Sequence, residues 1–216
     1  MFWDWFDSVS NLLDVRANTF RAMLEHVDKY DGPITIVETG CMRTKESWQD
    51  GCSTLIFDQY VTSRNDGSGV ISVDNSQAAV DACRELVSDQ VQVLCLDSVV
   101  FLYHFTQKAK HQSLSVPLFY LDSFDLDWAH WQPSAIHHLK ELAAISNFLD
   151  SETLVVVDDC AQFQHFVRSP DQTRTIDNAS GIGGKGRLIA EYAHSIGAEL
   201  VFSEYQAGWK GFNSNN

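Results

Sequence analysis

The chain has few basic residues. Lys and Arg number 15 against 29 Asp and Glu, which gives the 216 residues a formal net charge of −14. A nucleic-acid partner needs clustered Lys and Arg to contact its phosphates, so this balance argues against binding to DNA or RNA. No run approaches the roughly 20 apolar residues of a membrane span. We therefore expect neither a nucleic-acid nor a membrane partner.

Cysteines are few, and none are paired in a C-x-x-C motif. The chain has five, an odd number, which favours the reduced thiols of a cytoplasmic protein. The N-terminal stretch MFWDWFDSVSNLL lacks a basic leader, so an ordinary secretory signal is not expected. We interpret it as an amphipathic docking segment, because its polar face carries Asp4, Asp7 and Asp14 where a membrane-surface helix would carry Lys or Arg.

Two common nucleotide-binding motifs are missing. The phosphate-binding pattern G-x-x-x-x-G-K-[ST] does not occur. A dinucleotide site needs G-x-G-x-x-G after its first strand and an acid about 20 residues later. Here the corresponding turn, Glu38–Arg43, contains one glycine, and Asp74 lies 36 positions beyond Glu38. Binding of NAD or NADP is therefore disfavoured.

The sequence does contain a repeated pattern of short apolar runs that end on acidic residues. Such β-branched, near-continuous runs are typical of strands buried on both faces, as in a parallel sheet covered by helices. The runs are Thr35–Glu38, Val70–Asp74, Val91–Asp97, Leu118–Asp122 and Leu154–Asp159. Because helical patterns alternate with them, we predict an α/β fold with a Rossmann-like, doubly wound, mostly parallel sheet.

The remaining segments complete a single predicted domain, with a helical N-terminal segment at 1–30 and an α/β domain at 31–216. We expect Asp14 to cap the first long helix and the polar stretch 161–186 to be a mobile lid or disordered. The predicted helices are Asp14–Lys29, Ser53–Ser63, Gln77–Val87, Ser98–Lys110, Ser134–Leu149 and Arg187–Ile196, and the last of them precedes Glu199–Tyr205 and a short terminal run, Gln206–Phe212.

The acids that end the runs point to a binding crevice. In open sheets of this kind, ligands bind beyond the carboxyl ends of the strands. Carboxylates there can accept hydrogen bonds from ribose hydroxyls, balance a sulfonium or hold a divalent cation. One such Asp alone is as often a turn or cap residue, but five in register favour a ligand site. The acids are Glu38, Asp74, Asp97, Asp122, Asp158 and Asp159.

Three of these strand ends resemble the motifs of class I S-adenosylmethionine-dependent methyltransferases. They read VETG at Val37–Gly40, SVDN at Ser72–Asn75 and CLDS at Cys95–Ser98. Their order and spacing carry the resemblance over roughly residues 34 to 205, although the first motif lacks the second and third glycines. The resemblance implies that S-adenosylmethionine is the cofactor and that it lies across these three turns.

The implied cofactor contacts follow from the chemistry of each position. Gly40 would let the backbone approach the ligand, and Asp74 would bind the ribose hydroxyls. The start of the next helix has free N–H groups and hydroxyls that would hold the methionine carboxylate. The full predicted set is Glu38, Thr39, Gly40, Cys41, Gly51, Ser53, Thr54, Asp74, Asn75, Asp97, Ser98 and Asp122.

The later acids resemble the metal ligands of divalent-metal-dependent O-methyltransferases of the catechol and macrocin-like types. The resemblance implies that Asp122, Asp158 and Asp159 hold Mg²⁺, which favours oxygen ligands and would acidify an acceptor hydroxyl. An alternative left open is that Asp159 merely caps a loop while Asp158 alone faces the site.

The general base is predicted among residues that follow the fourth strand. Asp125 and Asp127 are the local candidates, and His137 is an alternative, as are His130 and His138. His137 and His138 lie on a helix with an apolar face, where a structural histidine is the commoner case.

Other residues near the predicted site allow two interpretations each. The aromatic residues Phe124, Trp128 and Trp131 would form either an acceptor wall or core contacts. Lys185, between glycines, is expected to be solvated, the alternative being that it closes over the site.

The sequence therefore predicts a Mg²⁺-dependent O-methyltransferase for a small hydroxylated acceptor, such as a sugar or a secondary metabolite. The alternatives are a metal-independent N- or carboxyl-methyltransferase of the same fold and a non-catalytic S-adenosylmethionine-binding module. A nucleotide-binding protein is disfavoured, because only Arg43 and Lys45 are basic near the strand ends. The sequence is compatible with a homo-oligomer.

Overall fold

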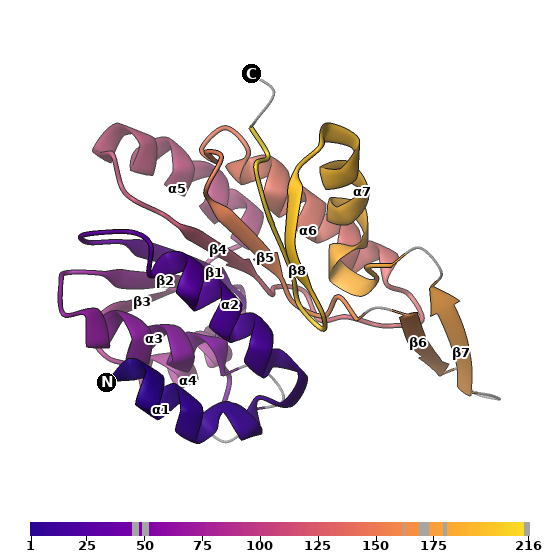
Figure 1. Cartoon of the computed structure of the whole chain (residues 1–216), viewed down its shortest axis with the longest axis horizontal. Coiled ribbons are helices and arrows are strands. Elements are labelled where there is room, and N and C mark those ends of the chain that lie inside the picture. The colour runs from indigo at the N-terminus through magenta and orange to yellow at the C-terminus, as the bar shows by residue number, and fades with distance from the viewer. Residues whose placement is uncertain (45–47, 49–51, 162, 169–172, 179–180, 214–216) are drawn as a thin grey trace.

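The computed structural model describes residues 1–44, 48, 52–161, 163–168, 173–178 and 181–213. Within this part of the chain, seven strands form one sheet in the order β3-β2-β1-β4-β5-β9-β8 (Figure 1). The first five strands are parallel, and β9 is antiparallel to both β5 and β8. The strands are β1 (Thr35–Thr39), β2 (Gly69–Asp74), β3 (Val91–Cys95), β4 (Leu118–Leu121), β5 (Leu154–Val157), β8 (Glu199–Ser203) and β9 (Ala207–Lys210).

Helices cover both faces of this sheet, as Figure 1 shows. Successive strand residues point to opposite faces, so Ile36 packs in one apolar cluster and Val37 in the other. The doubly wound, mostly parallel α/β fold is therefore confirmed. One face carries α1 (Phe2–Val9), α2 (Ala17–Val27), α3 (Ser53–Arg64) and α4 (Gln77–Arg84), and the other carries α5 (Ser98–Gln112), α6 (Gln132–Ile145) and α7 (Arg187–Ile196).

The N-terminal segment docks onto the fold itself. Phe2 and Phe6 are buried, and the Phe2 ring meets Tyr60 of α3 edge to face at 5.1 Å between ring centres. Two 3₁₀ turns, Ser10–Leu12 and Asp14–Arg16, connect α1 to α2. No described helix has the length and apolar character needed to cross a membrane.

The capping role predicted for Asp14 is wrong. Asp14 has a left-handed φ of 48° and begins the second 3₁₀ turn, and α2 starts only at Ala17, after Arg16, without a side-chain cap. The first residues of the predicted helix, Asp14–Arg16, therefore form a 3₁₀ turn instead. Its geometry places Arg16 at the start of α2.

The stretch after β5 contains regular structure that the sequence did not predict. Strand β6 (Phe163–Arg168) pairs with β7 (Thr173–Asn178) in a separate antiparallel hairpin, which projects from the body of the protein (Figure 1). A 3₁₀ turn, Gly184–Gly186, then leads directly into α7. The segment predicted to be a mobile lid or disordered therefore contains a hairpin and a helical turn.

The strands end slightly earlier than the apolar runs suggest. Strands β3, β4 and β5 stop at Cys95, Leu121 and Val157, before the acids that follow them. Those acids therefore lie in loops at the carboxyl edge of the sheet, where their side chains can turn toward a ligand or toward the protein.

Candidate functional site

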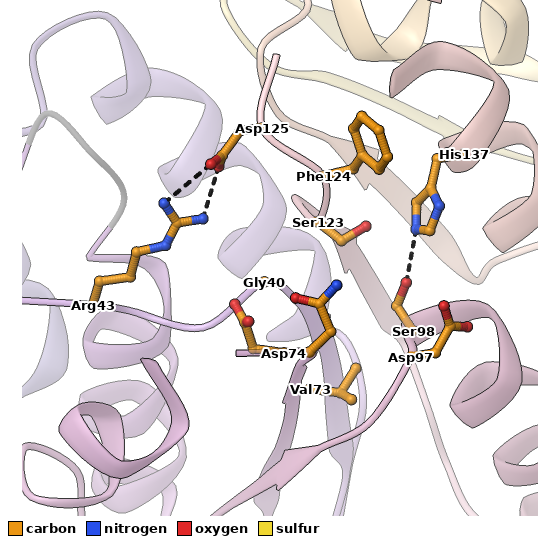
Figure 2. A pocket seen from close by; sticks show the side chains of 11 residues that line it. Gly40, Arg43, Val73, Asp74, Asp97, Ser98, Ser123, Phe124, Asp125 and His137 are labelled. Carbon is orange, nitrogen blue, oxygen red and sulfur yellow. Dashed lines mark hydrogen bonds and ion pairs between the residues drawn. The ribbon is translucent and has the colours of Figure 1, made fainter. Parts of the chain in front are cut away.

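Two adjoining cavities lie at the carboxyl edge of the sheet. The first has a volume of about 300 Å³, and Figure 2 shows the side chains around it. The second measures about 140 Å³ and is lined almost entirely by polar groups. Gly40, Arg43 and Asp125 line both cavities, so the two meet at these residues. The first cavity has the size of a small-ligand site.

The turn after β1 is held tightly by its neighbours. Gly40 has a left-handed φ of 82°, and its N–H donates to the carbonyl of Val73 at 2.8 Å. A Cβ at this position would lie 2.6 Å from the main-chain oxygen of Asp122. Glycine is thus required by the packing of β1 against β4, whereas the sequence suggested that only ligand approach required it.

The resemblance implied a ribose contact at Asp74 and a cofactor contact at Asn75. Both line the first cavity, and the half-buried carboxylate of Asp74 accepts hydrogen bonds from the N–H of Ser76 at 2.7 Å and of Cys41 at 3.3 Å. Each carboxylate oxygen accepts one of these bonds and has capacity for another. Asp74 is therefore oriented by the backbone and can still accept hydrogen bonds from a diol.

Asp97 and Ser98 line the far side of the same cavity. The Asp97 carboxylate accepts a hydrogen bond from the N–H of Val100 at 2.9 Å and so caps α5. The Ser98 hydroxyl lies 2.9 Å from Nε2 of His137, as Figure 2 shows. Asp97 therefore combines the cap role considered for such acids with a position at the cavity.

Three predicted cofactor residues lie beneath the turn and line neither cavity. Glu38 is fully buried and accepts hydrogen bonds from the hydroxyls of Thr54 at 2.7 Å and Ser72 at 2.5 Å. Burial raises the pKa of Glu38 to about 7. The carbonyl of Thr39 accepts from the N–H of Asp122 at 2.9 Å. Glu38, Thr39 and Thr54 thus support the turn from below.

The start of α3 contributes one predicted residue to the second cavity. Ser53 lines it together with Cys41, beside the first turn of the helix. The Thr54 hydroxyl, by contrast, is occupied by Glu38 and by the N–H of Met42 at 2.9 Å. Gly51 lies outside the described residues. Ser53 is therefore the predicted residue at the start of α3 that lines a cavity, and its hydroxyl also hydrogen-bonds to the buried Glu38 carboxylate.

The three predicted metal ligands already bind cationic side chains. Nζ of Lys185 lies 2.6 Å from Oδ1 of Asp122 and 3.0 Å from Oδ2 of Asp159. Nε of Arg16 lies 3.1 and 3.0 Å from the two carboxylate oxygens of Asp158. Among the described residues, no group of three or more His, Cys, Asp and Glu side chains is arranged to hold a metal ion. As arranged, the three acids do not fit Mg²⁺.

The two adjacent acids after β5 face different surroundings. Asp158 is buried against Arg16 and accepts a hydrogen bond from the Tyr120 hydroxyl at 3.0 Å. Asp159 lines the second cavity and accepts from the Tyr205 hydroxyl at 2.6 Å. Burial opposes ionisation of Asp159, but Lys185 and Tyr205 outweigh it and lower its pKa. The alternative in which Asp158 alone faces the site is therefore wrong, because Asp159 lines the second cavity and Asp158 does not.

The expectation of a solvated Lys185 is wrong. Its side chain is 3% exposed. Burial alone would lower the pKa of Lys185, but the carboxylates of Asp122 and Asp159 outweigh it and raise that pKa, so the ammonium form persists. A positively charged group thus lies at the inner end of the second cavity.

Three of the candidate bases, Asp125, Asp127 and His137, lie in different places. Asp125 lines both cavities and forms an ion pair with Arg43 (Figure 2). Hydrogen bonds from Arg43 lower the pKa of Asp125. His137 lines the first cavity only. Asp127 lines neither and accepts hydrogen bonds from Ala129 and His130 on the exposed loop. Position alone therefore favours Asp125.

A buried carboxylate supports the histidine side of the first cavity. Glu141 accepts a hydrogen bond from the Ser123 hydroxyl at 2.6 Å and lies 3.5 Å from Nε2 of His137. His138 is fully buried, with Nδ1 2.8 Å from the carbonyl of Ser134, as expected of a structural histidine. The ring of Phe124 lies 5.3 Å from that of His137 and lines the cavity.

Several residues that line the cavities were not predicted. Arg16 and Tyr205 reach the second cavity from the 3₁₀ turn before α2 and from the loop before β9, and Ser123 lines the first. Arg16 contacts Asp158 across 142 positions of sequence. No local spacing marks such a partner, because the contact depends on how α2 packs over the end of β5. Trp128 and Trp131 are half-buried and line neither cavity.

Comparisons with known proteins give distant structural likenesses. No family model matches the chain, and no curated protein matches it in sequence. The sugar N-methyltransferase KedS8 from Streptoalloteichus sp ATCC 53650 is similar over 97% of this chain and 91% of its own, with 12% identity and a TM-score of 0.46.

Two further solved structures are similar at the same level. An S-adenosylmethionine-dependent methyltransferase from Methanosarcina mazei matches over 85% of this chain and 93% of its own, with 9% identity and a TM-score of 0.46. Human N-acetylserotonin methyltransferase matches over 98% of this chain and 56% of its own, with 12% identity and a TM-score of 0.47. Likenesses this distant establish neither reaction nor substrate, which have to be inferred from the site.

Proposed function

We propose that this protein is an S-adenosylmethionine-dependent methyltransferase that acts on a small hydroxylated acceptor. One observation carries the proposal. A cavity of ligand size crosses the carboxyl ends of β1, β2 and β3, with Asp74 and Asp97 on it, and opens into a polar cavity beside Asp122. This is the arrangement that a nucleoside with a charged amino-acid tail requires.

The residues of the first cavity suit the nucleoside part of the cofactor. Asp74, oriented by two backbone N–H groups, would accept hydrogen bonds from the ribose hydroxyls. The exposed ring of Phe124 and the nearby His137 would provide a flat wall for a purine. Ser53, in the second cavity at the start of α3, would meet the carboxylate of the amino-acid tail.

The junction between the cavities suits the reacting groups. When bound, S-adenosylmethionine supplies an electrophilic methyl group on a sulfonium cation. Asp125 lies at the junction as an ionised carboxylate and, with Asp74 and Asp97 of the first cavity, would face that cation. In the proposed reaction, Asp125 accepts the proton that the acceptor hydroxyl loses.

Magnesium is not carried into the proposal, because Lys185 and Arg16 occupy the acids that would hold it. The same observation favours a second candidate, a metal-independent methyltransferase for a nitrogen or carboxyl acceptor. Such an acceptor needs no metal to acidify it. Mass spectrometry of products from a panel of hydroxyl, amine and carboxyl acceptors distinguishes the two, and cofactor binding without turnover of any acceptor would favour a binding module.

Calorimetry with S-adenosylhomocysteine tests the cofactor assignment. Asp74→Ala should weaken binding by about 1–3 kcal/mol, the usual loss for hydrogen bonds to a charged group. The matched control is Asp81→Ala, which removes an exposed acid on α4 that lines neither cavity. Wild-type protein that binds no S-adenosylhomocysteine contradicts the proposal. Equal affinity of Asp74→Ala and wild type contradicts the placement of the ribose.

A further inference from the structure

Lys185 is fixed in place by its backbone as well as by its side chain. Its N–H donates to the carbonyl of Asp159 at 3.2 Å. The flanking glycines allow this approach, because a Cβ at Gly184 would collide with the Asp159 carbonyl and one at Gly186 with Sγ of Cys160. The glycines of the GGKG sequence therefore allow a short helical turn to pack closely against the end of β5, with the side chain of Lys185 pointing inward.

The ammonium of Lys185 has oxygen partners in number equal to its N–H groups. Nζ lies 2.6 Å from Oδ1 of Asp122, 3.0 Å from Oδ2 of Asp159 and 3.3 Å from the main-chain oxygen of Asp122. An ammonium has three N–H donors and no acceptor. The three donors are therefore used within the protein, and Lys185 acts through its charge and position.

The neighbouring acid is satisfied separately. Arg16 binds both oxygens of Asp158 and also lies 3.6 Å from Oδ1 of Asp159. With two cations on three carboxylates, the cluster keeps a net charge of about −1 when all five groups are ionised. A divalent cation would have to displace a buried, paired ammonium to enter, which is strongly unfavourable.

We propose that Lys185 is the resident cation of this site, lying between Asp122 and Asp159 where a divalent metal would otherwise bind. It holds the two carboxylates at the inner end of the second cavity and offsets part of their negative charge. The inference stands apart from the proposed methyl transfer, since it concerns cation binding by the protein alone. It predicts that the wild-type protein has no divalent-cation requirement.

The test is Mn²⁺ binding to the cofactor-free protein, followed by electron paramagnetic resonance. Wild type should bind no Mn²⁺ at this site, and its melting temperature should be the same in Mg²⁺ and in chelator. Lys185→Ala should bind Mn²⁺ at least about tenfold more tightly than wild type, because removing a fixed positive charge leaves the acids free to attract a cation. Its melting temperature should rise with added Mn²⁺.

Two further variants locate the effect. Lys185→Ala combined with Asp122→Asn should lose the gained binding, and Lys210→Ala, which removes a lysine paired with Glu152 and Glu199 at the surface, should gain none. Tight Mn²⁺ binding by wild type that Asp122→Asn abolishes overturns the proposal, and this measurement needs no folded Lys185 variant. Folded Lys185→Ala without gained binding overturns it as well.

Discussion

Arg43 and Asp125 form a two-bonded ion pair where the two cavities meet. Nη2 of Arg43 lies 2.7 Å from Oδ1 of Asp125, and Nη1 lies 3.3 Å from Oδ2. The partners come from the loops after β1 and β4, which are 82 positions apart in sequence. Both side chains are largely exposed, so the pair contributes little to stability. Its role is to set the position and the ionisation of Asp125.

This pair makes the acid limb of the pH–rate profile depend on Arg43. Hydrogen bonds from Arg43 lower the pKa of Asp125, so the ionised base persists to lower pH than for an ordinary carboxyl group. Arg43→Gln should raise that pKa and move the acid limb of kcat/KM to higher pH. The profile of each protein, measured with saturating S-adenosylmethionine, is the check.

Asp125→Asn provides the companion measurement. It should lower kcat roughly 10²-fold or more, as expected for loss of a general base, while S-adenosylhomocysteine affinity changes little. An unshifted acid limb in Arg43→Gln, together with full activity in Asp125→Asn, would exclude Asp125 as the base and direct attention to His137.

We expect Gly40 to be required for the stability of the fold as well as for cofactor binding. Gly40→Ala places a Cβ at a left-handed φ and 2.6 Å from the Asp122 carbonyl oxygen. The left-handed conformation alone costs roughly 1–2 kcal/mol for a residue with a Cβ, and the collision adds to it. Urea unfolding should therefore show a clear loss of stability alongside weaker cofactor binding.

Gly32→Ala is the matched control for this substitution. Gly32 has a similar φ of 75°, but a Cβ there would meet no atom within 4 Å. It should show the conformational cost alone and bind S-adenosylhomocysteine normally. Equal losses of stability in the two variants would mean that the turn relaxes away from Asp122, contrary to the tight packing described here.

The parallel sheet could be predicted from the sequence because each of its strands is a local apolar run. Runs such as Val70–Asp74 can be recognised from neighbouring residues alone, and the acids that follow them necessarily lie at one edge. The cavity positions of Asp74, Asp97 and Asp125 follow from that rule. Strand spacing thus predicted where the crevice lies.

The partners of the acids could not be predicted in the same way. Whether a strand-end carboxylate faces a ligand or another side chain depends on contacts that are distant in sequence, such as Arg16 with Asp158. Lys185, which lies between glycines, was expected to be solvated. Those glycines in fact allow the turn to approach β5 closely. The resemblance therefore implied a metal at a place where the structure has two basic side chains, Arg16 and Lys185.

Glu38 should make the protein less stable as the pH rises from about 4.5 to 7. Burial raises the pKa of Glu38 from 4.5 to about 7, so in this window the folded state holds a proton that the unfolded state releases. Stability falls with pH wherever the folded state binds more protons, here by up to about 1.4 kcal/mol per pH unit.

Glu38→Gln tests this dependence. Its amide oxygen can still accept hydrogen bonds from Thr54 and Ser72, but the side chain no longer titrates, so the loss of stability with rising pH should disappear. Urea unfolding at pH 4.5 and pH 8 should show the variant gaining about 2–3 kcal/mol relative to wild type between the two. The pH 4.5 comparison is the internal control, because Glu38 is then protonated in the folded protein. Parallel pH dependence of the two proteins would show that the fold leaves the pKa of Glu38 unchanged.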